Sequence, residues 1–391
     1  MTDLYLLEPD RGPEWFPFSD CRPVAELRAG AWLVRERWEA IAEGETRAIF
    51  AGSHLQSFVE DGAPPVTAIK AIDGPAIIGC SAFAPSGAAP DLGKAPARLV
   101  HEEAPVGWWV PAGQRWEPGK EYSWPGVELE GIALRGAHDL VTALELLLAP
   151  DTADFLTEGG DALPDGCIVV GDPAEIVLLG ATIEPGVVFD TREGAVVIEQ
   201  GSYVKSGTRL DGPVYIGPRT DILGGPIRAC AIGPRCKVRG EVSNTVFVGF
   251  SNKAHDGFVG HSVVGRWVNL GAGTTTSNLK NTYGKVRLQV GTTPLPTERQ
   301  YLGSLIGDHV KTAIGTMFGT GTVVGVGANV FGEVRPPKYV MPFAWGGGTP
   351  ERMDRASFVA VAERVLGRRD VTVSPEIRQM LESLHQHAAG T

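Results

Sequence analysis

The chain has 391 residues, of which 43% are hydrophobic and 21% are charged, and its formal net charge is −11. This length exceeds what one ordinary hydrophobic core organises, so two structured regions are expected. No run approaches the roughly 18 consecutive apolar residues of a membrane span, and the negative charge disfavours general binding to nucleic acid. The first residues lack the basic and apolar segments of a secretory signal, so we expect a cytoplasmic protein.

The first 165 residues show the mixed patterns of an α/β domain. Apolar runs bounded by Gly and Pro predict strands, and apolar residues at helical spacing predict helices. A Pro-containing stretch at 150–164 is expected to link this domain to the next region. The expected strands span 4–7 and 76–83, and the expected helices span 32–43 and 138–148.

A repeat of six residues dominates the middle of the chain. Aliphatic residues recur at this step, and Gly follows several of them. Three short strands per turn place one aliphatic side chain at each inward position of a coil, a pattern that an ordinary β-sandwich does not hold. We therefore expect a left-handed parallel β-helix of hexapeptide repeats over residues 166–345. The clearest run is Ile198, Val204, Leu210, Ile216 and Ile222.

Two further segments interrupt or follow the repeat. Residues 278–302 are charged and contain Pro, so they are expected to form a loop extruded from the solenoid, where such proteins often bind ligands. Residues 346–391 carry two helical patterns, at about 354–366 and from Ser374 onward, with Pro375 in the first turn. We expect these helices to cap the open end of the solenoid. The predicted domains are 1–165 (α/β), 166–345 (β-helix) and 346–391 (helical cap).

Two histidines interrupt the Gly-rich repeat within the segment 252–261. Acetyl transfer from a thioester to an amine needs a base that works near neutral pH, and His255 is the candidate. The run 269–274 follows within one coil and supplies backbone N–H groups, including that of Gly273, as donors for a thioester carbonyl. A structural role is the alternative for His255, and it is the favoured role for His261.

Two strings resemble one known family, the bifunctional N-acetylglucosamine-1-phosphate uridyltransferases and glucosamine-1-phosphate acetyltransferases, and especially its divergent group with an atypical N-terminal domain. They are Lys253-Ala254-His255, which lacks one residue of the family's Lys-Ala-Gly-His, and Val268-Asn269-Leu270-Gly271-Ala272-Gly273-Thr274. The resemblance implies that His255 is the base, that acetyl-CoA is the donor and that a glucosamine-1-phosphate-type sugar is the acceptor. It also implies a site between neighbouring subunits, and therefore a homotrimer. Substrate contacts are implied at Lys253, Phe258, Asn269 and Asn278, and acetyl-CoA contacts at Ala272 and Thr316.

One position departs from the family. The family's sugar-phosphate lysine corresponds here to Asn244, whose amide carries no charge. Lys280 and Lys285, in the segment expected to be extruded, are the candidates to replace that charge.

The N-terminal domain resembles the family's nucleotidyltransferase half in outline, without its Gly-rich phosphate cradle. Arg11, Arg22 and Arg28 are the candidates to bind a nucleoside triphosphate such as UTP, because guanidinium groups match phosphate geometry by paired hydrogen bonds. The alternative is that they are exposed arginines without a ligand. Asp73, which precedes a predicted strand, is the candidate ligand for Mg²⁺.

Three functions are compatible with these patterns. The favoured one is an enzyme that acetylates an amino-sugar 1-phosphate and activates the product with a nucleoside triphosphate. The second is a sugar-1-phosphate nucleotidyltransferase, uridylyl or thymidylyl, whose β-helix only assembles the oligomer. The third is a non-catalytic scaffold, in which both domains keep their folds and lose their chemistry. The histidine-bearing coil favours the first.

Overall fold

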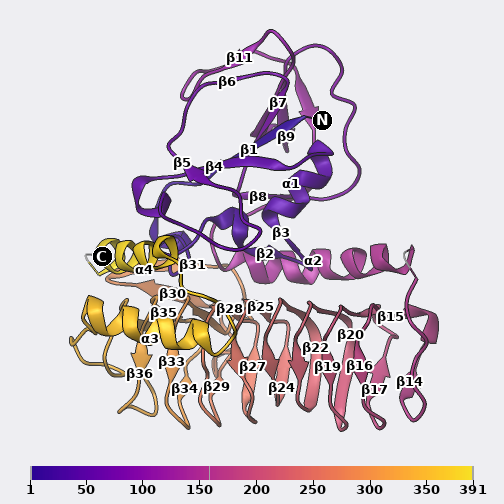
Figure 1. Cartoon of the computed structure of the whole chain (residues 1–391), viewed down its shortest axis with the longest axis vertical. Coiled ribbons are helices and arrows are strands. Elements are labelled where there is room, and N and C mark those ends of the chain that lie inside the picture. Colours follow the sequence, from indigo (N-terminus) through magenta and orange to yellow (C-terminus); the bar gives the residue numbers. More distant parts are fainter. Residues whose placement is uncertain (1, 158, 390–391) are drawn as a thin grey trace.

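The computed structural model describes residues 2–157 and 159–389 and contains an N-terminal α/β domain, a parallel β-solenoid and two C-terminal helices (Figure 1). The expected fold class is therefore confirmed. The α/β domain lies over one side of the solenoid, and helix α2 runs between the two (Figure 1). Within the described residues, no helix combines the length and apolar character that crossing a membrane requires.

A mixed sheet in the order β12-β9-β10-β7-β1-β4-β5 forms the centre of the α/β domain. Its middle strands are parallel, and β1 buries Leu4 and Leu6 on the face that α1 covers with Trp38. The period of two in β1 and the helical period in α1 direct these residues to the same core. The elements are β1 Asp3–Leu7, α1 Val34–Ala42, β4 Thr46–Phe50, β5 Val66–Thr67, β7 Ala76–Cys80, β9 Ala97–His101, β10 Ala104–Val110 and β12 Gly126–Glu128.

Two of the elements expected in this domain differ from the sequence prediction by more than two residues. The strand expected at 76–83 is divided into β7 and β8 (Phe83–Pro85). The helix expected to end near Leu148 is α2 (Asp139–Asp154), which continues through Pro150. Its buried residues Leu140, Leu144, Leu147 and Leu148 pack in the domain core, and this packing holds a helix that a proline alone would end.

The solenoid has three faces, which we name A, B and C, and the predicted run from Ile198 to Ile222 is fully buried inside it. Face A contains β14 Ile168–Val170, β17 Val188–Asp190, the first halves of β20 Thr208–Ile216 and β22 Gly225–Ile232, β24 Glu241–Ser243, β27 Phe258–Gly260, β29 Thr275–Thr276 and β34 Met317–Phe318. Face B contains β15 Ile176–Leu178, β18 Val196–Ile198, the second halves of β20 and β22, β25 Val246–Gly249, β28 Val263–Arg266, β32 Ser304–Ile306, β35 Thr322–Val324 and β37 Tyr339–Val340. Face C contains β16 Thr182–Ile183, β19 Tyr203–Val204, β21 Asp221–Ile222, β23 Lys237–Val238, β26 Asn252–Lys253, β33 Lys311–Thr312 and β36 Asn329–Val330.

Face B is the side that the N-terminal domain covers. Its outward residues Tyr215, Val246 and Val263 belong to the same apolar core as the α/β domain. Buried ion pairs cross this interface, since Arg22 lies 2.7 Å from Asp308. Faces A and C therefore remain for ligands.

Residues 278–302 leave the solenoid as predicted and form a hairpin of β30 (Arg287–Val290) and β31 (Thr293–Pro296). Arg299 at its base donates to Glu145 on α2 at 2.6 Å. The extruded segment is thus fixed against the N-terminal domain.

The predicted C-terminal helices are present as α3 (Arg355–Gly367) and α4 (Pro375–Ala388), but they do not close the end of the solenoid. Phe358 of α3 packs against Phe343 and His309, and Arg235, in an earlier coil, donates to the carbonyl of Arg369 at 3.0 Å. The helix therefore runs back along the coils (Figure 1). The apolar residues at the edge of the last coils, rather than the open end, determine where it packs.

Candidate functional site

His255 lies at the corner where faces C and A meet, beside a hollow of about 490 Å³. Gly257 shapes this corner, because its φ is +131° and a Cβ there would lie 2.3 Å from the carbonyl oxygen of Thr274. The hollow is lined by Arg239, Ala254, His255, Asp256, Gly257, Ala272 and Gly273.

Lys253 holds the corner from inside the solenoid. Its side chain is 2% exposed, and its Nζ donates to the carbonyl oxygens of Arg239 at 2.7 Å and His255 at 2.8 Å. Burial lowers the pKa of this amine to about 8. The structure does not support the substrate contact expected of Lys253, because the amine points inward and is bonded to the backbone.

The ring of His255 is exposed and has no hydrogen-bond partner within residues 2–157 and 159–389. Of the backbone N–H groups in the run 269–274, that of Gly273 donates to Asp256 and that of Gly271 to Thr312. The N–H of Ala272 is the one in this run without an acceptor in the described chain. Of the backbone donors predicted in this run, one N–H group is therefore available to a ligand, and it lies next to the predicted base.

Thr316, expected near acetyl-CoA, is 1% exposed, and its hydroxyl donates to the carbonyl of Ala313 at 2.9 Å. Thr316 lies in the coil after that of Ala272, because β34, which follows Thr316, pairs with β29, which follows Ala272. The hydroxyl keeps acceptor capacity, but its proton is bonded inside the protein.

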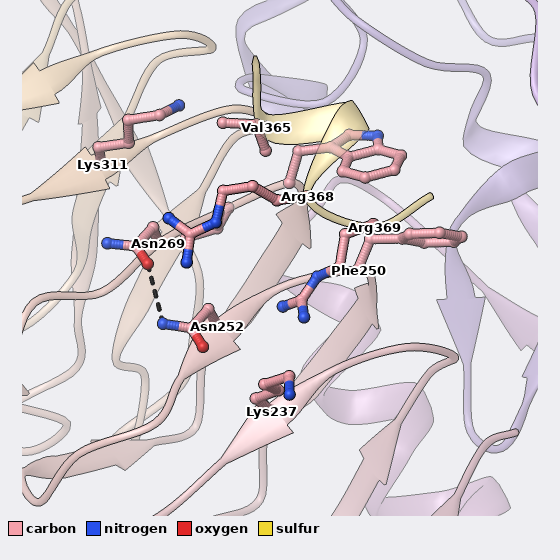
Figure 2. Close-up of a pocket in the computed structure, with 10 residues that line it drawn as sticks. Lys237, Phe250, Asn252, Asn269, Lys311, Val365, Arg368 and Arg369 are labelled. Carbon is pink, nitrogen blue, oxygen red and sulfur yellow. Dashed lines mark hydrogen bonds between the residues drawn. The ribbon is translucent and has the colours of Figure 1, made fainter. Parts of the chain in front are cut away.

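Asn269 lies on face C, where its Oδ1 accepts a hydrogen bond from Nδ2 of Asn252 at 2.8 Å. Figure 2 shows this pair at one wall of a pocket of about 410 Å³, with the end of α3 opposite. The pocket and the corner hollow are neighbours, because Asn252 lines the first and Ala254, two residues later, lines the second.

Phe258 and Asn278 lie on face A, around the corner from Asn269. Asn278 was expected near the base, but its amide donates to Nδ1 of His261 at 2.9 Å, at the opposite end of the face from His255. This contact requires the ring proton of His261 to be on Nε2, which lies 3.9 Å from Glu145. Burial lowers the pKa of His261, so the ring is neutral and held in place.

The candidates to replace the missing lysine differ in their surroundings. Asn244 has a φ of 47° at the corner between faces A and B. The amine of Lys285 pairs with Glu298, whereas Lys280 bonds the carbonyl of Lys285 and lines a third hollow, of about 660 Å³, together with Lys338. Only Lys280 of the two predicted lysines therefore borders an open space.

The arginines predicted to bind a nucleotide all have protein partners. Arg22 is 1% exposed and bonds Asp308 and Glu60. Arg28 is buried, donates to the carbonyl of Ala31 and lies over the ring of Tyr215. Arg11 lies 2.7 Å from Asp20. The partners of Arg22 are distant in the chain, so no pattern in the sequence indicated these contacts.

The carboxyl ends of β1 and β7 form the edge of the sheet where a ligand of an α/β fold is expected. Glu8 occupies it, and its carboxylate accepts hydrogen bonds from the N–H groups of Val24 and Ala25. Burial raises the pKa of Glu8 to about 7. Donors that a phosphate would use are thus bonded to an internal carboxylate.

Asp73, the predicted Mg²⁺ ligand, is exposed and forms an ion pair with Arg115 at 2.8 Å. Among the described residues, no three His, Cys, Asp or Glu side chains are grouped as a metal site. One exposed carboxylate bonded to a guanidinium is a poor ligand set by itself.

Comparison with known proteins relates the first domain to a known family. Residues 4–156 match the family described as sugar nucleotidyl transferase. The bifunctional sugar-1-phosphate nucleotidylyltransferase/acetyltransferase of Sulfurisphaera tokodaii is 35% identical over 151 residues, which cover 36% of this chain and 36% of that protein. The bifunctional protein GlmU of Methanococcus aeolicus is 29% identical over 153 residues, covering 35% of each chain, and that of Nostoc sp. is 26% identical over 209 residues, covering 48% and 45%.

These matches confirm the resemblance found in the sequence, and the relatives that they name are transferases. The chain spans about a third to under a half of the length of these relatives.

Proposed function

We propose that this protein transfers the acetyl group of acetyl-CoA to the amine of an amino-sugar 1-phosphate of the glucosamine-1-phosphate type, and that its N-terminal domain joins a nucleotide to the sugar phosphate. The observation that carries the first activity is the corner hollow, where an exposed imidazole lies beside an N–H without an acceptor in the described chain. Both belong to a corner that Lys253 fixes from inside.

The chemistry requires one base and one donor. His255 takes a proton from the attacking amine while the new N–C bond forms, and Ala272 donates its N–H to the thioester oxygen as that oxygen becomes negative. When the C–S bond breaks, the proton held by His255 passes to the departing sulfur. The CoA thioester supplies the activated acetyl group, and the small residues Ala272 and Gly273 leave room for it.

We propose a homotrimer, as the family resemblance implies, and the placement of the predicted contacts on two faces supports a site shared between copies. Asn269 projects from face C, whereas Phe258 and Asn278 lie on face A. These faces meet at the corner of His255 and point away from each other, so a single ligand reaches both sets only if a second copy supplies one of them. This arrangement also explains why Asn278 is distant from His255 within one chain.

The nucleotidyl activity rests on the family of residues 4–156 and on the relatives' names. The acidic residues described here do not fit a resident Mg²⁺ by themselves, since Asp73 is paired with Arg115 and Glu8 with backbone N–H groups. No step is therefore assigned to the ion.

Two other functions each have one observation in their favour. The absence of charge at Asn244 favours a nucleotidyltransferase whose solenoid only assembles the oligomer. The internal pairing of Arg11, Arg22 and Arg28 favours a scaffold.

The test is thiol release from acetyl-CoA with glucosamine-1-phosphate as acceptor, comparing the intact protein with the His255→Ala variant. We expect release by the intact protein and a loss of about 100-fold or more in the variant. His387→Ala, a histidine on α4, is the matched control and should keep the activity. Absence of release with every amino-sugar phosphate would sink the acetyltransferase proposal.

A further inference from the structure

The pocket on face C contains an excess of positive charge. Four cationic side chains line it, and none of the described residues that line it is a carboxylate: the cations are Lys237, Lys311, Arg368 and Arg369. Asp221 lies 2.8 Å from Lys237 and neutralises that one. The other three have no ion-pair partner within residues 2–157 and 159–389. Such an excess is unusual in a chain whose net charge is −11.

Burial makes this excess costly. Lys311 donates to the carbonyl of His309 at 3.0 Å, and desolvation lowers the pKa of its amine to about 8. Burial and the neighbouring charges of Arg368 and Arg235 lower the pKa of Arg369, although Cys236 and Asp221 act in the opposite direction. Positive groups that are desolvated and lie near one another are stabilised by an anion placed between them.

The end of α3 does not cancel this attraction. A helix C-terminus carries about half a negative charge, which repels anions. Here the last carbonyls are occupied, since Arg368 and Arg369 donate their N–H groups to Arg364 and Leu366, and Arg235 donates to the carbonyl of Arg369. The two full positive charges of Arg368 and Arg369 at the same place exceed the partial negative charge that remains at the end of the helix.

The remaining walls fit an organic ligand rather than a bare ion. Figure 2 shows Arg368 and Arg369 extending from the end of α3 toward the strands of face C, where Asn252, Asn269 and Lys237 face them. The rings of Phe250 and Trp267, 4.4 Å apart, form an apolar side. The volume of about 410 Å³ lies within the range of small-molecule sites.

We propose that this pocket binds the phosphate group of a substrate, between the guanidinium groups of Arg368 and Arg369 and the amine of Lys311. The proposal rests on the acetyl transfer proposed above, because the pocket adjoins the hollow of His255. Lys237 and Asn252 line the pocket, whereas Arg239 and Ala254, each two residues later, line the hollow. Two residues span about 7 Å along a strand.

Two substrates carry such a phosphate, the amino-sugar 1-phosphate and CoA. The experiment is calorimetric binding of glucosamine-1-phosphate, CoA and pyrophosphate to the full chain and to the Arg368→Gln/Arg369→Gln variant. The comparators are glucosamine, which has no phosphate, and dephospho-CoA, which lacks the 3′-phosphate of CoA and keeps its diphosphate. Arg364→Gln, an exposed arginine of α3 that does not line the pocket, is the matched control.

We expect the dissociation constant of one of the two substrates to rise about tenfold or more in the double variant, and to change less than twofold in the control. The substrate whose dissociation constant rises identifies the source of the phosphate. Lys311→Gln should weaken binding of the same substrate, and it replaces the double variant in this experiment if the double variant does not fold.

Unchanged affinity for all three ligands, or no binding of any of them to the intact protein, would overturn the proposal. These outcomes are independent of the proposed function, since His255→Ala should abolish acetyl transfer and still bind the ligand. Loss of transfer in His255→Ala with unchanged binding in the double variant would refute the phosphate site alone.

Discussion

Arginines in two regions of this molecule share their chemistry and differ in their surroundings. Arg22 is 1% exposed and bonds two carboxylates, Asp308 and Glu60, across the domain interface. Arg368 lines an open pocket and has no carboxylate partner in the described chain. Residue type and position along the chain therefore do not by themselves make an arginine a ligand-binding group. The counter-charges that the fold brings to it decide whether a guanidinium is available for phosphate.

The same contrast holds for the two predicted sites as wholes. Around Arg22 and Glu8, donors and acceptors are bonded to one another inside the protein. Around His255, the imidazole and the N–H of Ala272 have no partners among the described residues. The first arrangement holds two domains together, and the second is suited to bind a ligand.

The largest effect is expected from Arg22→Met, which tests whether Arg22 holds the two domains together. Removing one member of a buried ion-pair group leaves Asp308 desolvated without its main partner, and we expect a loss of about 3 to 5 kcal/mol in the free energy of unfolding. Urea denaturation of the full chain measures it. The double variant Arg22→Met/Asp308→Leu should recover part of the loss, because it leaves no unpaired carboxylate at that point.

UTP binding provides the opposing outcome for Arg22. If the arginine holds the triphosphate, Arg22→Met would lose UTP binding while its stability changed little. That result would place Arg22 in a nucleotide site and remove the distinction between the two regions.

The pH dependence of the free energy of unfolding tests the contribution of Glu60 to the same buried ion-pair group. Arg22 and Arg266 lower the pKa of Glu60 to about 2, although its burial acts in the opposite direction. A carboxyl with a lowered pKa contributes stability above its unfolded value of about 4.5 and loses it as pH falls toward 2. We expect this group to account for about 3 kcal/mol of the loss over that window, and Glu60→Gln to flatten the acid side of the stability curve. An identical curve for both proteins would show that the pair adds nothing.

The solenoid could be predicted in detail because its signal is local. Ile198, Val204 and Leu210 are placed six apart by the coil geometry itself, so period alone identifies them as core. The N-caps Asp354 and Ser374 are local in the same way. The position of α3 along the flank was missed, because it depends on Phe343 and His309, which belong to other coils.

The site was only partly predictable for the same reason. His255, Ala272 and Gly273 share one hollow, as their spacing of about one coil implies. The inward direction of Lys253 and the pairing of Asn278 with His261 depend on which face each side chain takes. Arg368 and Arg369 carry no motif, and only the fold brings them to Asn269.

Lys253→Met tests whether the corner must be held from inside. The variant keeps an unbranched side chain one atom shorter and removes its bonds to the carbonyls of Arg239 and His255, so the imidazole should be less well positioned. The two lost charge-assisted bonds are worth about 3 kcal/mol together, and part of this energy positions the imidazole, so we expect kcat for acetyl transfer to fall about tenfold or more with KM unchanged. Lys205→Met, an exposed lysine of an earlier coil, is the control. A rise in KM with constant kcat would instead restore the substrate contact expected from the sequence.

The smallest effect is expected from Phe258→Tyr, which tests whether face A forms part of the site that binds the acceptor sugar. Phe258 is half-buried beside Asn278 and has no hydroxyl to offer. The resemblance described above implies a sugar-phosphate-binding Tyr at this position. A new hydroxyl on this face should add one hydrogen bond to the acceptor and lower its KM about threefold at constant kcat. Phe331→Tyr, where the ring packs on Trp345, adds the same group away from this site and should change nothing. An unchanged KM in Phe258→Tyr would leave face A outside the acceptor site and assign recognition of the sugar phosphate to face C alone.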